Sequence, residues 1–288
     1  MEFFTAPFFD PEVRHSFAAV LALALSAGPV GVFLMLRRMS LVGDAMSHAI
    51  LPGVAVGFLL GGLSVFAMTA GGLVAGLAIA LLAGAISRAT ELQEDASLAV
   101  FLLVSLALGV VIVLVNGMDI EKLMEFLFGE TEAKMNADKL VVIAANATLS
   151  LAALALIYRP LVIDCVDPVF LRTVSRSGGV AHLAFLALLV LNLISAFHAF
   201  GTLLGVGIII IPAAIARFWT RDITRMILLA VVGALVAGWA GLMLSFHATI
   251  PSGPAVTLTA GVLYMISVVC GPVGGLLWRA FPGRHLEA

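Results

Sequence analysis

Long apolar runs separated by short polar stretches dominate the chain. Eight runs can cross a bilayer as helices, because about 20 apolar residues span its hydrocarbon core. They lie near residues 16–36, 41–62, 65–87, 96–116, 139–158, 179–198, 224–246 and 255–277. A ninth run, 201–216, is shorter and contains Pro212, so it predicts a short span, a bent span or part of a re-entrant unit. The pattern predicts an all-α polytopic membrane protein with about eight or nine transmembrane helices.

Arginine placement predicts the sidedness of these helices. Arginines follow alternate apolar runs, and the positive-inside rule assigns such positions to the cytoplasm. They are Arg37 and Arg38, Arg88, Arg159 with Arg172 and Arg176, Arg217 with Arg221 and Arg225, and Arg279 with Arg284. This alternation fits nine crossings with the N-terminus outside and the C-terminus inside. Residues 117–139 fall on the opposite side and are rich in Asp and Glu, which predicts an acidic outer mouth.

The composition supports a single membrane domain covering residues 1–288. The chain is 62% hydrophobic and 11% charged, with a mean hydropathy of +1.18, values outside the range of soluble globular domains. It has no basic patch that could hold nucleic acid. The first ten residues lack the basic region of a cleaved signal peptide, and Cys165 and Cys270 are too few for a disulfide framework.

Asp44 and His48 are ionisable residues inside an otherwise apolar run. Their spacing of four places them on one helix face, and ionisable groups at membrane depth are by default hypotheses about function. Carboxylate and imidazole both bind divalent metals such as manganese and zinc. One subunit supplies too few ligands, but a twofold dimer would supply two of each. Alternatively, the two side chains pair with each other, or Asp44 caps a helix that begins near Gly43. Pro52 and Gly53 follow one turn later and loosen the helix.

Other polar residues in the apolar runs admit two interpretations. His198 and His247 fall near the acidic side, so they form either an entry relay for a metal or ordinary interfacial side chains. His182, Asn146 and Asn192 are expected to form hydrogen bonds between helices.

Small residues at a spacing of four predict close helix packing in the second and third spans. They are Gly53, Gly57 and Gly61, then Gly72, Gly76, Ala80 and Gly84. Such rows let two helix backbones approach each other.

The loop over residues 159–179 predicts a short helix on the cytoplasmic face. It opens with a proline, offers Asp167 as an N-cap before Pro168, and closes on two glycines. Such a helix is either a docking element for a partner or an ordinary interfacial helix. The lysines all lie in the acidic outer segment, none of them in a Walker A motif. Any ATP must therefore bind another chain, and without HExxH or GxSxG motifs the protein is expected to be a transporter and not an enzyme.

Five segments carry a resemblance to a known family. They are Ala27-Gly-Pro-Val-Gly31, Arg37-Arg-Met-Ser-Leu-Val-Gly-Asp-Ala-Met-Ser-His-Ala-Ile-Leu-Pro-Gly53, Phe126-Leu-Phe-Gly129, the run 201–216, and Pro251-Ser-Gly-Pro254. In order and spacing the chain resembles the permease subunit of the ABC-3 family, the bacterial importers of zinc, manganese and related metals. The second segment is the most specific of the five.

This resemblance implies a fold, partners and roles. The fold would be that of a type II, cobalamin-importer-like permease, working as a homodimer in the bacterial inner membrane. ABC ATPase subunits would dock at the cytoplasmic face, and a periplasmic or lipid-anchored binding protein would deliver the metal. Asp44 and His48 match the positions of a transient Zn²⁺ or Mn²⁺ site, with no stably bound cofactor. Within the loop 160–178, the coupling element would comprise Asp167, Pro168, Val169, Phe170, Leu171 and Arg172.

One departure from the family pattern and two alternative functions stay open. Where family members often have an aspartate shortly before Pro-x-Gly, this chain has His247-Ala-Thr-Ile250. The alternatives are a permease of the same fold for a metal chelate, such as a siderophore or cobalamin, and a proton-coupled secondary carrier. The choice between zinc and manganese also stays open, because the same ligands serve both metals.

Overall fold

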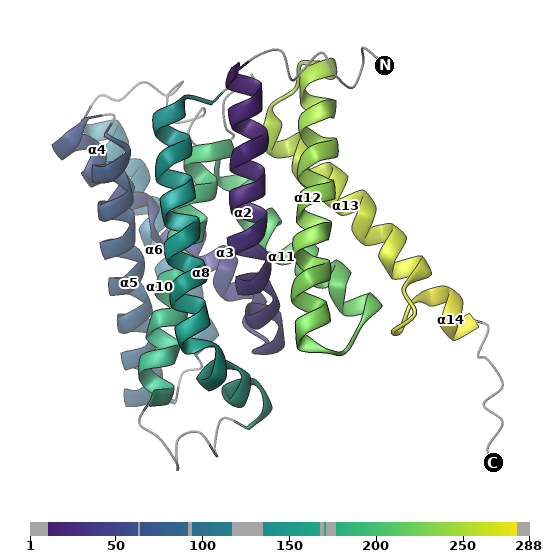
Figure 1. Ribbon diagram of the computed structural model, residues 1–288. Coiled ribbons are helices and arrows are strands. Elements are labelled where there is room, and N and C mark those ends of the chain that lie inside the picture. Colours follow the sequence, from purple (N-terminus) through teal and green to yellow (C-terminus); the bar gives the residue numbers. More distant parts are fainter. Residues whose placement is uncertain are drawn as a thin grey trace.

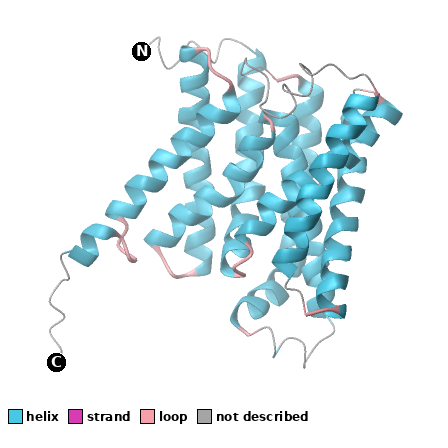
Figure 2. Cartoon of the chain, turned by 180° about the vertical axis from the view of Figure 1, so that it is seen from behind, coloured by secondary structure: helices cyan, strands magenta, loops and turns pink. Residues whose placement is uncertain are grey.

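The computed structural model describes residues 11–62, 64–91, 94–116, 135–167, 170 and 177–280. These residues are helical apart from short turns and caps, and Figure 2 shows no strand among them. The helices are α2 (Pro11–Leu36), α3 (Ser40–Ala49), α4 (Leu51–Gly61), α5 (Val65–Ala89), α6 (Glu94–Val115), α8 (Ala137–Val166), α10 (Ser177–Phe200), α11 (Thr202–Trp219), α12 (Ile223–Ala248), α13 (Ser252–Cys270) and α14 (Leu276–Ala280).

Eight segments of the described residues are long and apolar enough to cross a membrane, in agreement with the eight long hydrophobic runs. The second of them, Val42–Gly61, combines α3 and α4. The shorter helix α11 continues the chain from α10 to α12, and in Figure 1 α10 ends and α12 begins on opposite sides of the bundle. Helix α11 therefore crosses the bundle, as expected for an odd number of passes. Which side faces the cytoplasm stays a prediction.

The second span is interrupted at Ile50, between α3 and α4. Pro52 is in the first turn of α4 and has no N–H. The carbonyl of His48 therefore lacks the helical hydrogen bond that residue 52 would normally donate. The chain stays nearly helical through the interruption, because the Ile50 amide donates to the Met46 carbonyl at 3.2 Å and the Val54 amide to the Ile50 carbonyl at 3.0 Å. The loosening expected beside Pro52 is thus a short break between two helices.

Helices α4 and α5 approach each other along the predicted row of glycines. A Cβ atom added to Gly53 would collide with the carbonyl oxygen of Gly71, and one added to Gly57 would collide with that of Ala67. A Cβ on Gly61 would lie 2.5 Å from the Cβ of Ala67. The glycine spacing therefore forms a packing seam within one subunit, as small residues in membrane helices do.

Helix α8 is longer than its sequence suggested. The span was expected to end at residue 158 and the cytoplasmic loop to begin with Pro160, but the helix runs through Pro160 to Val166. A proline inside a membrane helix removes one hydrogen bond, and neighbouring helices can compensate for that loss. Here Leu161 is fully buried in the core, and Asp164 forms an ion pair with Arg37, which directly follows α2. These contacts hold the additional turns in place.

Two hydrogen bonds connect α8 to α10 inside the bundle. The Asn146 Nδ2 donates to the Ser195 Oγ at 3.0 Å, and the Asn192 Nδ2 donates to the Ser150 Oγ at 3.1 Å. Both asparagines were predicted to form such interhelical bonds, and both predictions are confirmed.

The core of the bundle lies around α2 and α10. Phe33, Phe185 and Phe200 are among its largest fully buried side chains. The outer surface is also apolar, with Val115 of α6 79% exposed and Leu258 of α13 63% exposed. A surface of this kind suits contact with lipid.

Candidate functional site

Helix α3 carries both residues of the candidate site. Its most extensive contacts are with α6, and it also contacts α11, α5 and α10. Val42, Met46 and Ala49 are buried on its packed side. Asp44 is exposed and His48 is partly buried. The spacing of four places the two side chains on one face, about 6 Å apart along the helix axis.

The two alternatives for Asp44 and His48 are not supported by the structure. Within the described residues, no ion pair or hydrogen bond joins the two side chains, since the ion pair found there is between Arg37 and Asp164. Helix α3 begins at Ser40 with Met39 as its N-cap residue, so Asp44 lies inside the helix and does not cap it. The Asp44 side chain, which is exposed, is therefore accessible to a ligand or to another chain, and it is not paired with His48.

The imidazole of His48 is incompletely satisfied. Its Nδ1 atom is buried and has no hydrogen-bond partner in the described part of the chain. Buried polar atoms are almost always paired, so an exception calls for an explanation such as an absent ion, water or ligand. An imidazole nitrogen and a nearby carboxylate are suitable donors for a transition metal.

The described part of the chain does not complete a metal site around this pair. Among the described residues, no group of three or more His, Cys, Asp and Glu side chains is placed to hold a metal ion. Stable zinc sites use four ligands, or three with an open position. If Asp44 and His48 bind a metal, further ligands have to come from outside the described residues of one chain.

His198 and His247 do not join Asp44 and His48 in such a group. The Nε2 of His198, on α10, lies 3.3 Å from the Oγ1 of Thr69 on α5. His247 is exposed near the end of α12, with its ring edge-on to that of Phe246 at 5.3 Å between centroids. Their role in an entry relay stays a prediction.

Asp167 caps a turn, as its position before Pro168 predicted. Its Oδ1 accepts a hydrogen bond from the amide of Phe170 at 2.9 Å. The other residues expected in the coupling element, Pro168, Val169, Leu171 and Arg172, lie outside the described residues, as does the acidic segment 117–134.

A charged cluster that the sequence did not reveal lies between α2, α8 and α10. The Nη2 of Arg37 is 2.8 Å from the Oδ2 of Asp164 and 2.6 Å from the Nδ1 of His182. Its guanidinium carbon lies 5.1 Å from the centroid of the Phe185 ring. His182 was expected to bond between helices, and this is confirmed. The sequence marked Arg37 as an indicator of sidedness and as the start of one family-like segment, but no local spacing connects it with Asp164.

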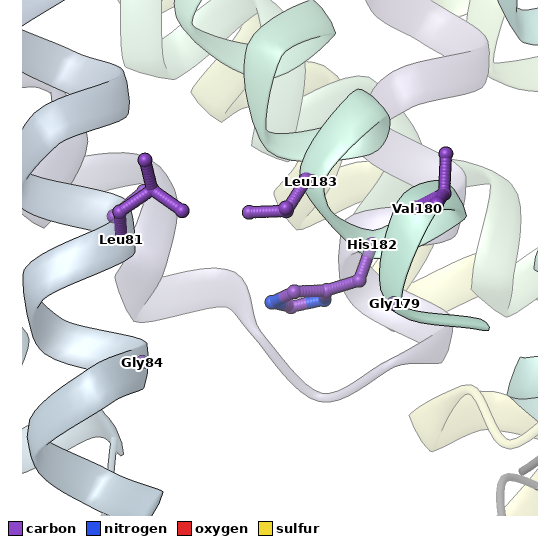
Figure 3. Close-up of a pocket in the computed structure, with 7 residues that line it drawn as sticks. Leu81, Gly84, Gly179, Val180, His182 and Leu183 are labelled. Carbon is purple, nitrogen blue, oxygen red and sulfur yellow. The ribbon is translucent and has the colours of Figure 1, made fainter. Parts of the chain in front are cut away.

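A pocket of about 270 Å³ lies beside this cluster, between α5 and α10. Figure 3 shows the His182 side chain extending into it from α10, next to Leu183 and toward the α5 helix that carries Leu81 and Gly84. Its lining is Ala80, Leu81, Gly84, Gly179, Val180, His182 and Leu183. Because His182 is the one ionisable residue of this lining, the pocket is poorly suited to a metal ion.

Comparisons with known proteins agree with this architecture. Residues 10–271 match the model of the ABC 3 transport family. The manganese import system permease protein ScaB of Streptococcus parasanguinis is 32% identical over 260 residues, which are 90% of this chain and 91% of that protein. The zinc transport system membrane protein TroC of Treponema pallidum is 29% identical over 290 residues, 97% of this chain and 96% of that protein. A chain in the structure of PsaBC from Streptococcus pneumoniae in complex with Fab superposes with a TM-score of 0.86 at 27% identity, covering 97% of this chain and 99% of that one.

Proposed function

The chain belongs to the ABC 3 transport family, and on that premise we propose that it is the membrane permease subunit of an ATP-driven importer for manganese or zinc. Relatives named for each of the two metals cover at least 90% of the chain, which supports this metal class. In this proposal the permease works as a homodimer in the bacterial inner membrane. Separate ATPase subunits bind at the cytoplasmic face, and a periplasmic or lipid-anchored protein delivers the metal.

The exposed carboxylate of Asp44 is the observation that carries the proposal. It lies within a candidate span, Val42–Gly61, and a charged side chain facing hydrocarbon is costly, up to about 2.5–3.5 kcal/mol at the centre of a membrane helix on insertion scales. This face of α3 is therefore expected to be covered by a second copy or to border an aqueous path. Two copies of α3 facing each other would contribute two carboxylates and two imidazoles, a donor set suited to manganese or zinc.

An incomplete shell in each subunit suits transport. A site in a translocation path must bind the ion strongly enough to capture it and weakly enough to release it. Ligands divided between two subunits can separate when the subunits move, which lowers the affinity at release. ATP-driven movement would reach the permease through the predicted coupling element, residues 167–172.

Uptake of radioactive Mn²⁺ and Zn²⁺ tests the metal site. The assay uses cells that lack their own importers and express the chain with its ATPase and binding protein. Asp44→Asn and His48→Gln each remove a ligand with little change of shape. We expect each to lower uptake at least about 10-fold, because even residues that only support metal ligands alter affinity 10- to 100-fold.

Matched substitutions separate loss of the site from loss of the protein. Asp222→Asn is the control for Asp44→Asn, because Asp222 is an exposed carboxylate that caps α12 through the Arg225 amide at 2.9 Å, and asparagine also caps helices. Uptake by this control should match the wild type at equal membrane levels. His198→Gln and His247→Gln test the entry relay in the same cells. Normal uptake by both the Asp44 and His48 variants would overturn the site assignment.

A further inference from the structure

Arg37 occupies a hydrogen-bonded turn that leads directly into α3. The amide of Arg38 donates to the carbonyl of Met35, and that of Met39 to the carbonyl of Leu34, both at 3.0 Å. Arg38 has a φ of 58°. This pattern is a Schellman motif, in which a residue in the left-handed conformation ends a helix and reverses the chain. Helix α3 begins at Ser40, so only Arg38 and Met39 separate Arg37 from its first residue.

The side chain of Arg37 connects this turn to α8 and α10. It is only 9% exposed, and its ion-pair partner Asp164, in the last turn of α8, is 18% exposed. Arginine has donors only, so the Nδ1 of His182 must accept the hydrogen bond, which requires a neutral imidazole with its proton on Nε2. Phe185, one turn further along α10, packs against the guanidinium.

The two polar partners of Arg37 flank the predicted coupling element in the sequence. Asp164 comes three residues before Asp167, and His182 lies in the second turn of α10. The asparagine bonds between α8 and α10 lie further along both helices, away from these ends. Arg37 therefore joins the facing ends of α8 and α10 to the turn before α3.

The cluster is not a closed, fully satisfied network. The Nη1 of Arg37 is buried and has no hydrogen-bond partner among the described residues. The pocket of about 270 Å³ beside His182 leaves space into which the imidazole can move (Figure 3). A buried group without a partner calls for a structural or functional explanation.

We propose that Arg37 is a positioning residue that transmits movement of the cytoplasmic ends of α8 and α10 to α3, and thereby to Asp44 and His48. This inference rests on the proposed function. ATP-driven displacement of the two helix ends shifts Asp164 and His182, the guanidinium follows them, and the hydrogen-bonded turn carries the shift to α3. Without Arg37, ATP is still hydrolysed, but the shift is not delivered to the metal ligands.

The ratio of Mn²⁺ transported to ATP hydrolysed tests this role. The complete transporter, with its ATPase subunits and binding protein, is reconstituted into liposomes, and both quantities are measured. Arg37→Met should keep basal ATP hydrolysis within about twofold of the wild type and lower the Mn²⁺ to ATP ratio at least about 10-fold. Arg38→Gln is the matched control, because Arg38 is the adjacent, exposed arginine, and its ratio should be unchanged.

Further variants distinguish transmission from a general structural role. Asp164→Asn should lower the ratio as Arg37→Met does, and the double variant should be no worse than either, because the two residues act as one unit. The exchange Arg37→Asp with Asp164→Arg should restore part of the ratio. If Arg37→Met does not accumulate in the membrane, Arg37→Lys and His182→Gln are measured instead. Each is expected to lower the Mn²⁺ to ATP ratio partially.

An unchanged ratio in the Arg37 variants, or additive losses for Arg37 and Asp164, would overturn the inference. If the wild type imports metal and the Arg37 variants import equally well per ATP, only the inference is wrong. If the wild type imports neither Mn²⁺ nor Zn²⁺, the proposed function is wrong and the inference with it.

Discussion

Replacing Gly53 with alanine tests the closeness of the seam between α4 and α5. The added Cβ would collide with the carbonyl oxygen of Gly71 and would lie 2.5 Å from the Cβ of Ala75. Carbon atoms in good contact are about 3.5–4.0 Å apart, so the two helices would have to separate by about 1 Å. Such a separation also loosens the contact between Gly57 and Ala67 further along the seam.

The expected loss follows from comparison with a glycine in open space. A Cβ on Gly261, inside α13, would meet no atom within 4 Å. Both substitutions gain the same intrinsic helix preference of alanine over glycine, about 1 kcal/mol. The difference in unfolding free energy between the two variants therefore measures the cost of the collision. Overpacking of this kind costs about 1–3 kcal/mol. We expect Gly53→Ala to be less stable than Gly261→Ala by that amount.

Unfolding in mixed micelles of dodecyl maltoside and sodium dodecyl sulfate, followed by circular dichroism, measures the difference. A second substitution sharpens the test, because Gly71 faces Gly53 directly. Once one alanine has separated the helices, Gly71→Ala should add little, so the double variant should lose less than the sum of the two. The reasoning is refuted if Gly53→Ala is as stable as Gly261→Ala.

Three further predictions use the same unfolding assay. Arg38→Gly should stabilise the protein by about 1 kcal/mol, because glycine adopts the φ of 58° found there without strain. A loss of stability would contradict the left-handed conformation of Arg38. Phe33→Ala should destabilise the protein by about 3–5 kcal/mol, because this side chain is fully buried and its ring packs edge-on against that of Tyr158, with 5.7 Å between centroids. A loss below about 1 kcal/mol would mean that the core around Phe33 is loosely packed. Asn192→Ala should cost roughly 1 kcal/mol through its lost bond to Ser150, and Ser150→Ala should then have no further effect.

The helical spans were predictable because each depends on local composition. A run of about 20 apolar residues becomes a membrane helix almost regardless of its neighbours. The course of α8 past Pro160 was not predictable in this way, because a proline's effect depends on tertiary contacts such as those of Leu161 and Asp164. The sequence shows the proline but not what packs around it.

The candidate site likewise combines residues that the local sequence identifies with residues that only tertiary contacts identify. Asp44 and His48 stand out because two ionisable residues contrast with an apolar run and share one helix face. Arg37 does not stand out, because its partner His182 is 145 residues away in the chain and arginines at the ends of membrane helices are ordinary. Its burial, which gives it a role beyond sidedness, is visible only in three dimensions.

The exposed carboxylate of Asp44 also has a consequence for the life of the protein in the cell. A chain inserted alone, with nothing covering this face of α3, presents the carboxylate at membrane depth. If a second copy covers this face, as proposed, assembly removes the penalty, and the stability of the chain then depends on how many copies are present, as it does for proteins whose folded state requires a partner. Newly made copies that find no partner should be the preferred substrates of membrane proteases. The steady-state amount of the chain should therefore depend on assembly more directly than on transport activity.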